Sequence, residues 1–341
     1  MAATPLHEPP VDRRLIDALW AAADPEGCLS FRDYMAVTLY APEVGYYRQS
    51  RQRVARQATA DFYTATSLGR VFYPLMHAAA VTLLNGADPA EYTLVEIGVE
   101  PGCSTPVGPF GAVQSLTLEV VAEGSVALPA KTVLLANEIL DAQPFHRLIL
   151  QDGHWHELGV RIDEDGNRQE VRMADMSPAL AEWAKSLPND LGNGYIIDIA
   201  LEAESWLQRW LEGTWEGLVI LPDYGRSLHE LLEACPAGTA RGYFRHRRVE
   251  DLLALPGLMD LTCDVCWDRI EAVLAHYCSR QGLERQEAFF MHHAAGSLES
   301  LFREDPEAMG ALRELLHPAM MGHRFQVLWG RVDRPQAPPA S

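Results

Sequence analysis

The chain has 341 residues, 48% of them hydrophobic, which is enough for one large domain or two smaller ones with a substantial core. Its 28 Lys and Arg residues stand against 47 Asp and Glu residues, giving a formal net charge of -19. This balance argues against binding to nucleic acid or to anionic membranes, since both need a basic surface, and it is compatible with a cationic partner.

The N-terminus and the cysteines indicate the compartment. The first residues lack the basic and apolar regions of a secretory signal, and no apolar run is long enough to span a membrane. The six cysteines are scattered along the chain, unlike those of a disulfide framework. We therefore predict a cytoplasmic protein.

Residues 1–90 are predicted to form an N-terminal helical region. After a Pro-rich tail, hydrophobic residues recur at helical spacing over 14–23 and over 31–40, where Ser30 is a candidate N-cap. A third helix is expected over 67–85, ended by Asn85-Gly86.

Three short apolar segments, 93–97, 115–120 and 132–136, are predicted to be strands. The proline and glycine residues within 99–114 exclude a helix there, although parallel strands are usually joined by one. Two readings stay open: the connection is an irregular loop, or the strands are not all parallel neighbours.

Strands and helices alternate through the rest of the chain, which predicts an α/β fold. A hairpin is expected within 145–175, and a helix is expected over 270–281. We divide the chain into residues 1–90, a core over 91–230 that contains the hairpin, a C-terminal part over 231–330 that completes the sheet, and a tail over 331–341.

The first candidate site is Val95-Glu-Ile-Gly98, followed by Gly102. A glycine after a strand lets the backbone approach a nucleotide-type cofactor, and an acid about 20 residues further on binds ribose hydroxyls. Glu119 lies at that distance. The alternative is an ordinary turn after a strand.

Two further carboxylate motifs follow apolar runs, Asn137-Glu-Ile-Leu-Asp141 and Asp223-Tyr-Gly225. Amide and carboxylate groups at strand ends can orient a nucleophilic nitrogen, and paired carboxylates suit the planar fork of a guanidinium. The alternatives are a capped helix for the first motif and a solvated turn for the second. Cys263 and Cys266 suit a redox couple or half of a zinc site, but we favour two buried structural cysteines and predict no metal site.

These motifs, taken together, resemble the MidA-like family of class I S-adenosylmethionine-dependent methyltransferases. The matching runs are Phe31–Tyr40 with Gly45-Tyr-Tyr47, Asp61-Phe-Tyr-Thr64, Val95–Gly98, Ala136–Pro144, Asp223–Gly225, Gly238-Thr239 with Arg241, Tyr243 and His246, Pro256-Gly257 with Asp260-Leu-Thr262, and Met321-Gly322 with Phe325 and Val327-Leu328.

The resemblance implies a Rossmann-like core, abbreviated around its glycine-rich loop and extended by helical and hairpin elements. It also implies S-adenosylmethionine as cofactor and a protein arginine as substrate, with no nucleic acid or membrane partner; an oligomer is compatible with it. The residues implied at the cofactor are Glu96, Gly98, Gly102, Glu119 and Tyr63. Those implied near the transferred methyl group are Asn137, Glu138, Asp141, Asp223 and Tyr224.

The sequence departs from the family in two places. Glu100 stands where the glycine-rich loop should have a glycine, and Pro101 and Pro106 block the helix that the loop should open. The family run Thr-x-His-Val-Asp-Phe is Thr262-Cys-Asp-Val-Cys-Trp267 here. The alternative function is therefore a catalytically degenerate member, a pseudoenzyme that serves as a protein-binding or assembly factor.

Overall fold

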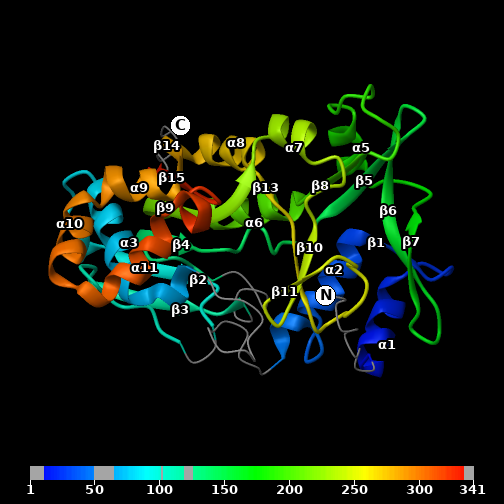
Figure 1. Ribbon diagram of the computed structural model, residues 1–341, viewed down its shortest axis with the longest axis horizontal. Helices are drawn as coiled ribbons and strands as arrows, with labels where there is room; N and C mark the ends of the chain where they lie inside the picture. The colour runs from blue at the N-terminus through cyan, green and yellow to red at the C-terminus, as the bar shows by residue number, and fades with distance from the viewer. Residues whose placement is uncertain (1–10, 50–64, 101–102, 119–125, 334–341) are drawn as a thin grey trace, which may run out of the picture.

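The computed structural model describes residues 11–49, 65–100, 103–118 and 126–333. It has two lobes, each built around its own β-sheet, with a small third sheet between them (Figure 1). Helices α3, α9, α10 and α11 lie at one end of the molecule, and strands β5–β7 lie at the other (Figure 1).

The larger sheet is Rossmann-like. Its strand order is β14-β15-β9-β4-β2-β3, and β13 pairs with β9. The first four strands in chain order pair in parallel, whereas β15 runs antiparallel to β9 and β14. The bounds are β2 (Thr93–Ile97), β3 (Ala112–Leu116), β4 (Lys131–Ala136), β9 (Glu216–Arg226), β13 (Val265–Cys266), β14 (Cys278–Arg285) and β15 (Phe325–Val332).

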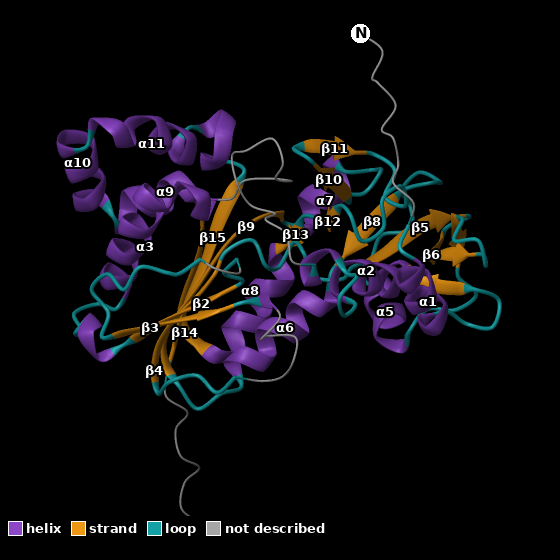
Figure 2. Cartoon of the chain, turned by 90° about the horizontal axis from the view of Figure 1, so that it is seen from below, coloured by secondary structure: helices purple, strands orange, loops and turns teal. Residues whose placement is uncertain are grey.

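Helices cover both faces of this sheet, which explains why its central strands are continuous apolar runs. Leu94 and Val133 face one helical layer, and their neighbours Val95 and Leu134 face the other. Figure 2 shows the two layers on either side of the strands. The first layer contains α3 (Gly69–Leu83), α9 (Gln286–His293), α10 (Ala295–Glu304) and α11 (Met309–Leu316), and the second contains α6 (Leu201–Leu211) and α8 (Trp267–Tyr277).

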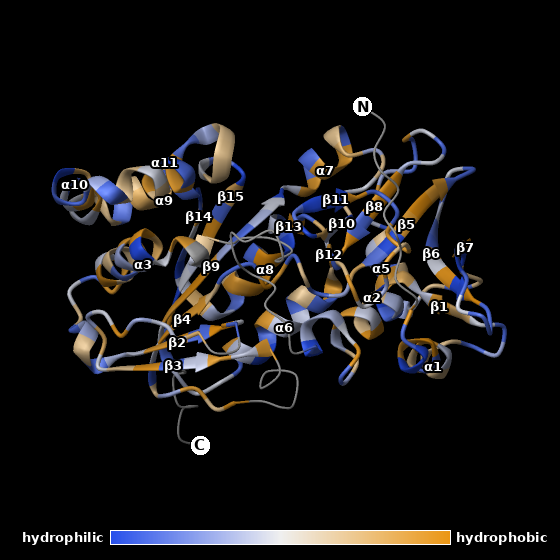
Figure 3. Cartoon of the chain, turned by 60° about the horizontal axis from the view of Figure 1, so that its bottom comes forward, coloured by the Kyte–Doolittle hydropathy of each residue, from blue (hydrophilic) through white to orange (hydrophobic). Residues whose placement is uncertain are grey.

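The smaller lobe is an antiparallel sheet in the order β1-β6-β5-β8, with β7 paired to β6. Its strands are β1 (Cys28–Ser30), β5 (His146–Gln151), β6 (His154–Ile162), β7 (Arg168–Arg172) and β8 (Ile196–Ile199). Two hydrophobic clusters pack against this sheet. Its strand β5 carries a run of hydrophobic residues (Figure 3). One contains α1 (Arg13–Ala22) and α2 (Phe31–Tyr40), and the other contains α5 (Pro178–Ala184) and α7 (Leu228–Ala234).

The third sheet has the order β11-β10-β12, with β10 (Arg241–Phe244), β11 (Arg247–Val249) and β12 (Asp260–Thr262). Short turns of helix complete the fold: η1 (Tyr46–Arg48), η2 (Ala65–Leu68), η3 (Pro89–Glu91), η4 (Pro306–Ala308) and η5 (Pro318–Gly322).

The α/β class and the Rossmann-like core are confirmed, and two element predictions need correction. The second predicted strand, 115–120, is β3 and ends at Leu116. The helix predicted over 270–281 ends at Tyr277, and the chain continues as β14 because its backbone pairs with β15. The predicted hairpin belongs to the smaller lobe, where β1 and β8 extend it. The four-part division of the chain remains a prediction.

Candidate active site

A cavity of about 1400 Å³ opens at the carboxyl ends of the parallel strands. The chain leaves β2 toward β3 on one side and returns to β4 on the other, so the strand order reverses between β2 and β4. Ligands of open α/β sheets bind at such a reversal point. Gly98 follows β2, Asn137 follows β4, and both line the cavity.

Glu96 is the acid at the end of β2, and its residue is only 3% exposed. The Tyr73 hydroxyl of α3 donates to both carboxylate oxygens at 3.2 Å, and the Thr105 hydroxyl donates a short hydrogen bond to Oε2. Burial raises the pKa of Glu96, and these hydrogen bonds oppose the rise. The carboxylate therefore lines the cavity in a fixed orientation.

The segment after β2 forms no helix in residues 98–100 and 103–111, as its prolines predict. Of the two alternatives left open by the sequence, the irregular loop is correct, because β2 and β3 are parallel neighbours. The amides of Gly98 and Val99 both donate to the Leu116 carbonyl, at 2.8 and 3.1 Å. Gly98 has φ +86°, and a Cβ there would lie 2.2 Å from Cδ1 of Ile139.

Asn137 and Glu138 form the opposite wall of the cavity. The Asn137 amide donates to Glu138 Oε1 at 2.9 Å, and Ala65 N donates to the same oxygen at 3.2 Å. The Asn137 Oδ1 atom is buried and has no hydrogen-bond partner. Burial, followed by the charge of Asp141, raises the pKa of Glu138 to about 8. An orphaned acceptor beside two carboxylates suits a ligand rich in N–H and O–H groups, as S-adenosylmethionine is.

Asp141 and Tyr224 line the same cavity. Burial raises the pKa of Asp141 to about 6, while a hydrogen bond from Tyr224 and the charge of Arg241 oppose that rise. The Arg241 guanidinium lies 4.5 Å from the centre of the Tyr224 ring. This contact holds the Tyr224 ring against Arg241 of β10.

Asp223 differs from the other predicted site residues because it does not line the cavity. It is 1% exposed, and its oxygens accept from the amides of Leu140, Asp141 and Tyr224 at 2.9, 3.3 and 2.8 Å. Burial raises its pKa well above the ordinary range. The side chain thus holds the backbone under the cavity floor.

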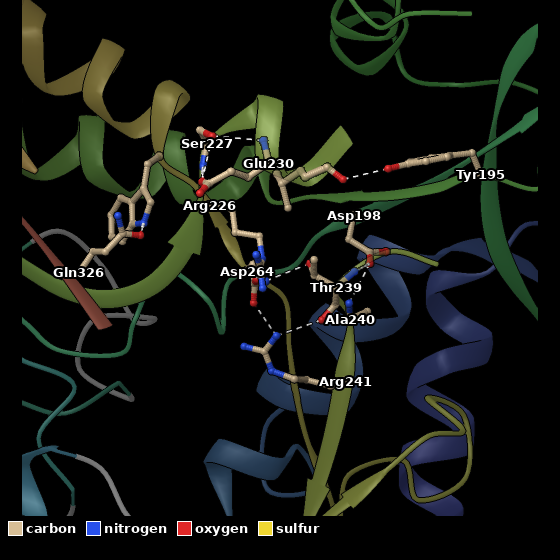
Figure 4. A network of polar contacts seen from close by, with 12 residues as sticks. Tyr195, Asp198, Arg226, Ser227, Glu230, Thr239, Ala240, Arg241, Asp264 and Gln326 are labelled. Carbon is tan, nitrogen blue, oxygen red and sulfur yellow. Dashed lines mark hydrogen bonds and ion pairs between the residues drawn. The ribbon is translucent and has the colours of Figure 1, made fainter. Parts of the chain in front are cut away.

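Sequence reasoning did not single out the role of Asp264. Its carboxylate lies between Arg241 Nη1 at 2.5 Å and Arg226 Nε at 2.8 Å (Figure 4). All three residues line the cavity. The sequence feature that could have indicated this role is the departure from the family run at Thr262–Trp267, where Asp264 replaces the family's histidine.

Several predicted residues need separate mention. Tyr63, Gly102 and Glu119 lie outside the described residues. Cys263 and Cys266 are buried as free thiols in different hydrophobic clusters, and burial raises both thiol pKa values. Within the described ranges, no group of three or more His, Cys, Asp and Glu side chains could hold a metal ion.

Comparison with known proteins agrees with this geometry. Residues 118–284 match the family described as putative S-adenosyl-L-methionine-dependent methyltransferase. A crystal structure from Burkholderia thailandensis, bound to S-adenosyl-homocysteine, is 25% identical and covers 98% of this chain and 96% of its own, with a TM-score of 0.80. The matched family, the named relatives and this solved structure support the predicted resemblance to MidA-like S-adenosylmethionine-dependent methyltransferases.

Named relatives of the chain include the mitochondrial protein arginine methyltransferase NDUFAF7 of Danio rerio, 26% identical over 203 residues. That match covers 57% of this chain but only 46% of the relative's length. The Drosophila melanogaster homologue is 24% identical over 368 residues, covering 89% of this chain and 81% of its own.

The predicted cytoplasmic location is wrong, because these relatives are named as mitochondrial proteins. None of the described helices has the combination of length and apolarity that a membrane span requires.

Proposed function

We propose that this chain transfers a methyl group from S-adenosylmethionine to a guanidinium nitrogen of a protein arginine. The carrying observation is the cavity at the strand reversal, where Glu96 and the orphaned Asn137 Oδ1 lie beside Glu138 and Asp141. An arginine substrate is supported by the similarity to proteins named as arginine methyltransferases.

The cavity residues divide into two groups by position. Glu96, Gly98 and Asn137 follow β2 and β4, and in this proposal they bind the cofactor at the reversal point. Bound there, the cofactor supplies an electrophilic methyl group. Glu138, Asp141 and Tyr224 line the same cavity, and in this proposal they orient the guanidinium.

The two cavity carboxylates favour a cationic substrate. Glu138 lies close enough to Asp141 for that charge to raise its pKa, and desolvation disfavours the ionised form of both groups, with pKa values of about 8 and about 6. A guanidinium placed between them would neutralise both charges and satisfy their oxygens. These carboxylates would also orient the attacking nitrogen, so catalysis consists of positioning and charge stabilisation.

Isothermal titration with S-adenosyl-homocysteine tests the cofactor half of the proposal. We expect saturable binding to the wild-type chain and about tenfold weaker binding for Asn137→Ala, which removes the orphaned acceptor. Asn193→Ala, in an exposed turn where Asn193 accepts from Asp152 N, is the matched control. Binding without methyl transfer to any arginine peptide, together with capture of a stable protein partner, would favour the degenerate-member alternative; no binding at all would contradict the proposal.

A further inference from the structure

The described residues of the loop after β2 form no helix that could hold a glycine-rich loop in place, yet the far end of this loop is anchored by Thr105. Thr105 is 5% exposed, although it lies in an irregular segment between two strands. Irregular segments usually run over the surface because their backbone groups need water. The burial of this hydroxyl residue therefore requires internal hydrogen-bond partners.

Thr105 has such partners on both neighbouring strands. Its hydroxyl donates to Glu96 Oε2, and therefore it accepts from Ser115 Oγ, which lies 2.9 Å away. The Thr105 amide donates to the same Ser115 oxygen at 3.2 Å. Each hydroxyl thus has one donor and one acceptor role, so the direction of every hydrogen bond in the network is fixed.

This network replaces part of what the missing helix would supply. A helix N-terminus contributes backbone N–H groups and a partial positive charge next to the cofactor. Here residues 98–100 and 103–104 line the cavity, and none of them is helical. Its far end is fixed to Glu96 by Thr105, and its near end is fixed to Leu116 by Gly98 and Val99.

We propose that Thr105 is a positioning residue for the cofactor, which fixes both the Glu96 carboxylate and the cavity-lining segment that precedes it. The inference rests on the proposed function, because it assigns Glu96 to the cofactor. Tyr73 holds the same carboxylate from α3, so Glu96 is restrained from two elements. A hydroxyl at position 105 is required, and the threonine methyl group is not.

Thr105→Val and Thr105→Ser separate this role from packing. Valine keeps the volume and removes the hydrogen bonds, whereas serine keeps the hydrogen bonds. For Thr105→Val we expect the dissociation constant of S-adenosyl-homocysteine and the KM for S-adenosylmethionine to rise about tenfold, because hydrogen bonds to a charged group are lost. The kcat at saturating cofactor and the KM for an arginine peptide should change by less than about twofold, and Thr105→Ser should stay within about twofold of wild type in all four.

The matched control is Thr132, a fully buried threonine near the start of β4. Its hydroxyl donates to the Pro129 carbonyl at 2.8 Å, at the opposite end of the strand from the cavity. Thr132→Val should lower thermal stability and leave cofactor affinity unchanged. If Thr105→Val does not fold, Ser115→Ala is the substitute, since it removes the donor to the Thr105 hydroxyl and the acceptor of the Thr105 amide. This variant should raise the same dissociation constant about threefold. If Thr105→Val, or its substitute Ser115→Ala, binds S-adenosyl-homocysteine with wild-type affinity, this inference is overturned and the proposed function is not. If the wild-type chain binds no S-adenosyl-homocysteine, both are overturned.

Discussion

Asp223 holds the floor of the cavity through the backbone. Three amides donate to its two oxygens, and those of Leu140 and Asp141 belong to the turn after β4 that carries Glu138 and Asp141. A carboxylate that accepts several backbone hydrogen bonds is a fixed structural group, and its removal leaves buried donors unpaired.

We therefore predict that Asp223→Asn lowers the free energy of unfolding by about 1–3 kcal/mol, because an NH₂ group would face a backbone donor. Urea unfolding followed by circular dichroism measures this change. Asp88→Asn is the control, since Asp88 accepts from Ala90 N in an exposed turn and should cost under about 0.5 kcal/mol. A fully stable Asp223→Asn chain with lost turnover would instead place Asp223 in the chemistry.

Glu138 is half-buried and carries a positive φ of 54°, so both its backbone conformation and its ionised form are unfavourable. Its folded pKa of about 8 lies above the ordinary value of 4.5. The stability that the protonated carboxyl supplies is complete below pH 4.5 and is lost as the pH rises through 8.

Glu138→Gln should abolish this loss, because glutamine stays neutral. Calorimetric Tm values of the two chains should converge near pH 5 and separate toward pH 9, with the variant the more stable. Glu182→Gln, an exposed position paired with Lys185, should follow the wild-type curve. A wild-type Tm that does not fall relative to Glu138→Gln between pH 6 and 9 would contradict the raised pKa.

Among the elements, the turn after β2 depends most on a single residue. Gly98 combines φ +86° with a close approach of Ile139. Gly98→Ala should lower stability by about 1–3 kcal/mol, from the left-handed backbone and from the clash with the end of a flexible side chain. Gly86→Ala is the matched control: it has φ +88° with nothing within 4 Å of the added Cβ, so it should show the backbone cost alone, about 1 kcal/mol.

A double-mutant cycle with Ile139→Ala isolates the clash. Gly98→Ala and Ile139→Ala should be non-additive by about 0.5–3 kcal/mol, because the smaller side chain removes the contact. Additive effects would mean that the glycine is needed only for its backbone angle. Urea midpoints of the four chains decide between these outcomes.

The elements also show how far the sequence could be interpreted. The apolar runs of β2 and β4 predict buried parallel strands. Pro101 and Pro106 predict no helix between β2 and β3, and residues 98–100 and 103–111 contain none. Beyond the β3 edge, the described residues add no strand, although the common doubly wound order would place a third strand there. The short span between β3 and β4 is consistent with this absence.

Features that depend on distant partners could not be predicted. The first residues of β14 continue the hydrophobic spacing of the helix predicted over 270–281. They form a strand because their backbone groups hydrogen-bond to β15. Asp223 and Asp141 have similar sequence settings, yet one lies beneath the floor and the other in the cavity. The roles of Thr105 and Asp264 depend on contacts with Ser115 and Arg226, which no local pattern indicates.

At the scale of the whole molecule, the cavity lies between the two lobes. Glu96 and Gly98 come from the larger lobe, whereas Tyr47 follows the helices that pack on the smaller sheet, and its hydroxyl donates to Asp260 at 2.7 Å. In the proposed function the cofactor depends on the larger lobe, whereas the substrate binds in a cavity that Glu138, Asp141 and Tyr224 of the larger lobe share with Tyr47. Damage to the smaller lobe should therefore affect the substrate and not the cofactor.

Phe31 and Phe72 are fully buried in the smaller and the larger lobe respectively. Phe31 stacks on Phe145 at 5.3 Å, and Phe72 precedes Tyr73, the partner of Glu96. Replacing either with alanine should cost about 3–5 kcal/mol of stability. Both variants are compared at a temperature where they remain folded. Phe31→Ala should raise the KM for an arginine peptide and leave the dissociation constant of S-adenosyl-homocysteine within about twofold of wild type. Phe72→Ala should raise that dissociation constant. Equal effects of the two variants on cofactor affinity would show that the lobes do not divide the two ligands, because a cofactor that contacted both would respond to the loosening of either.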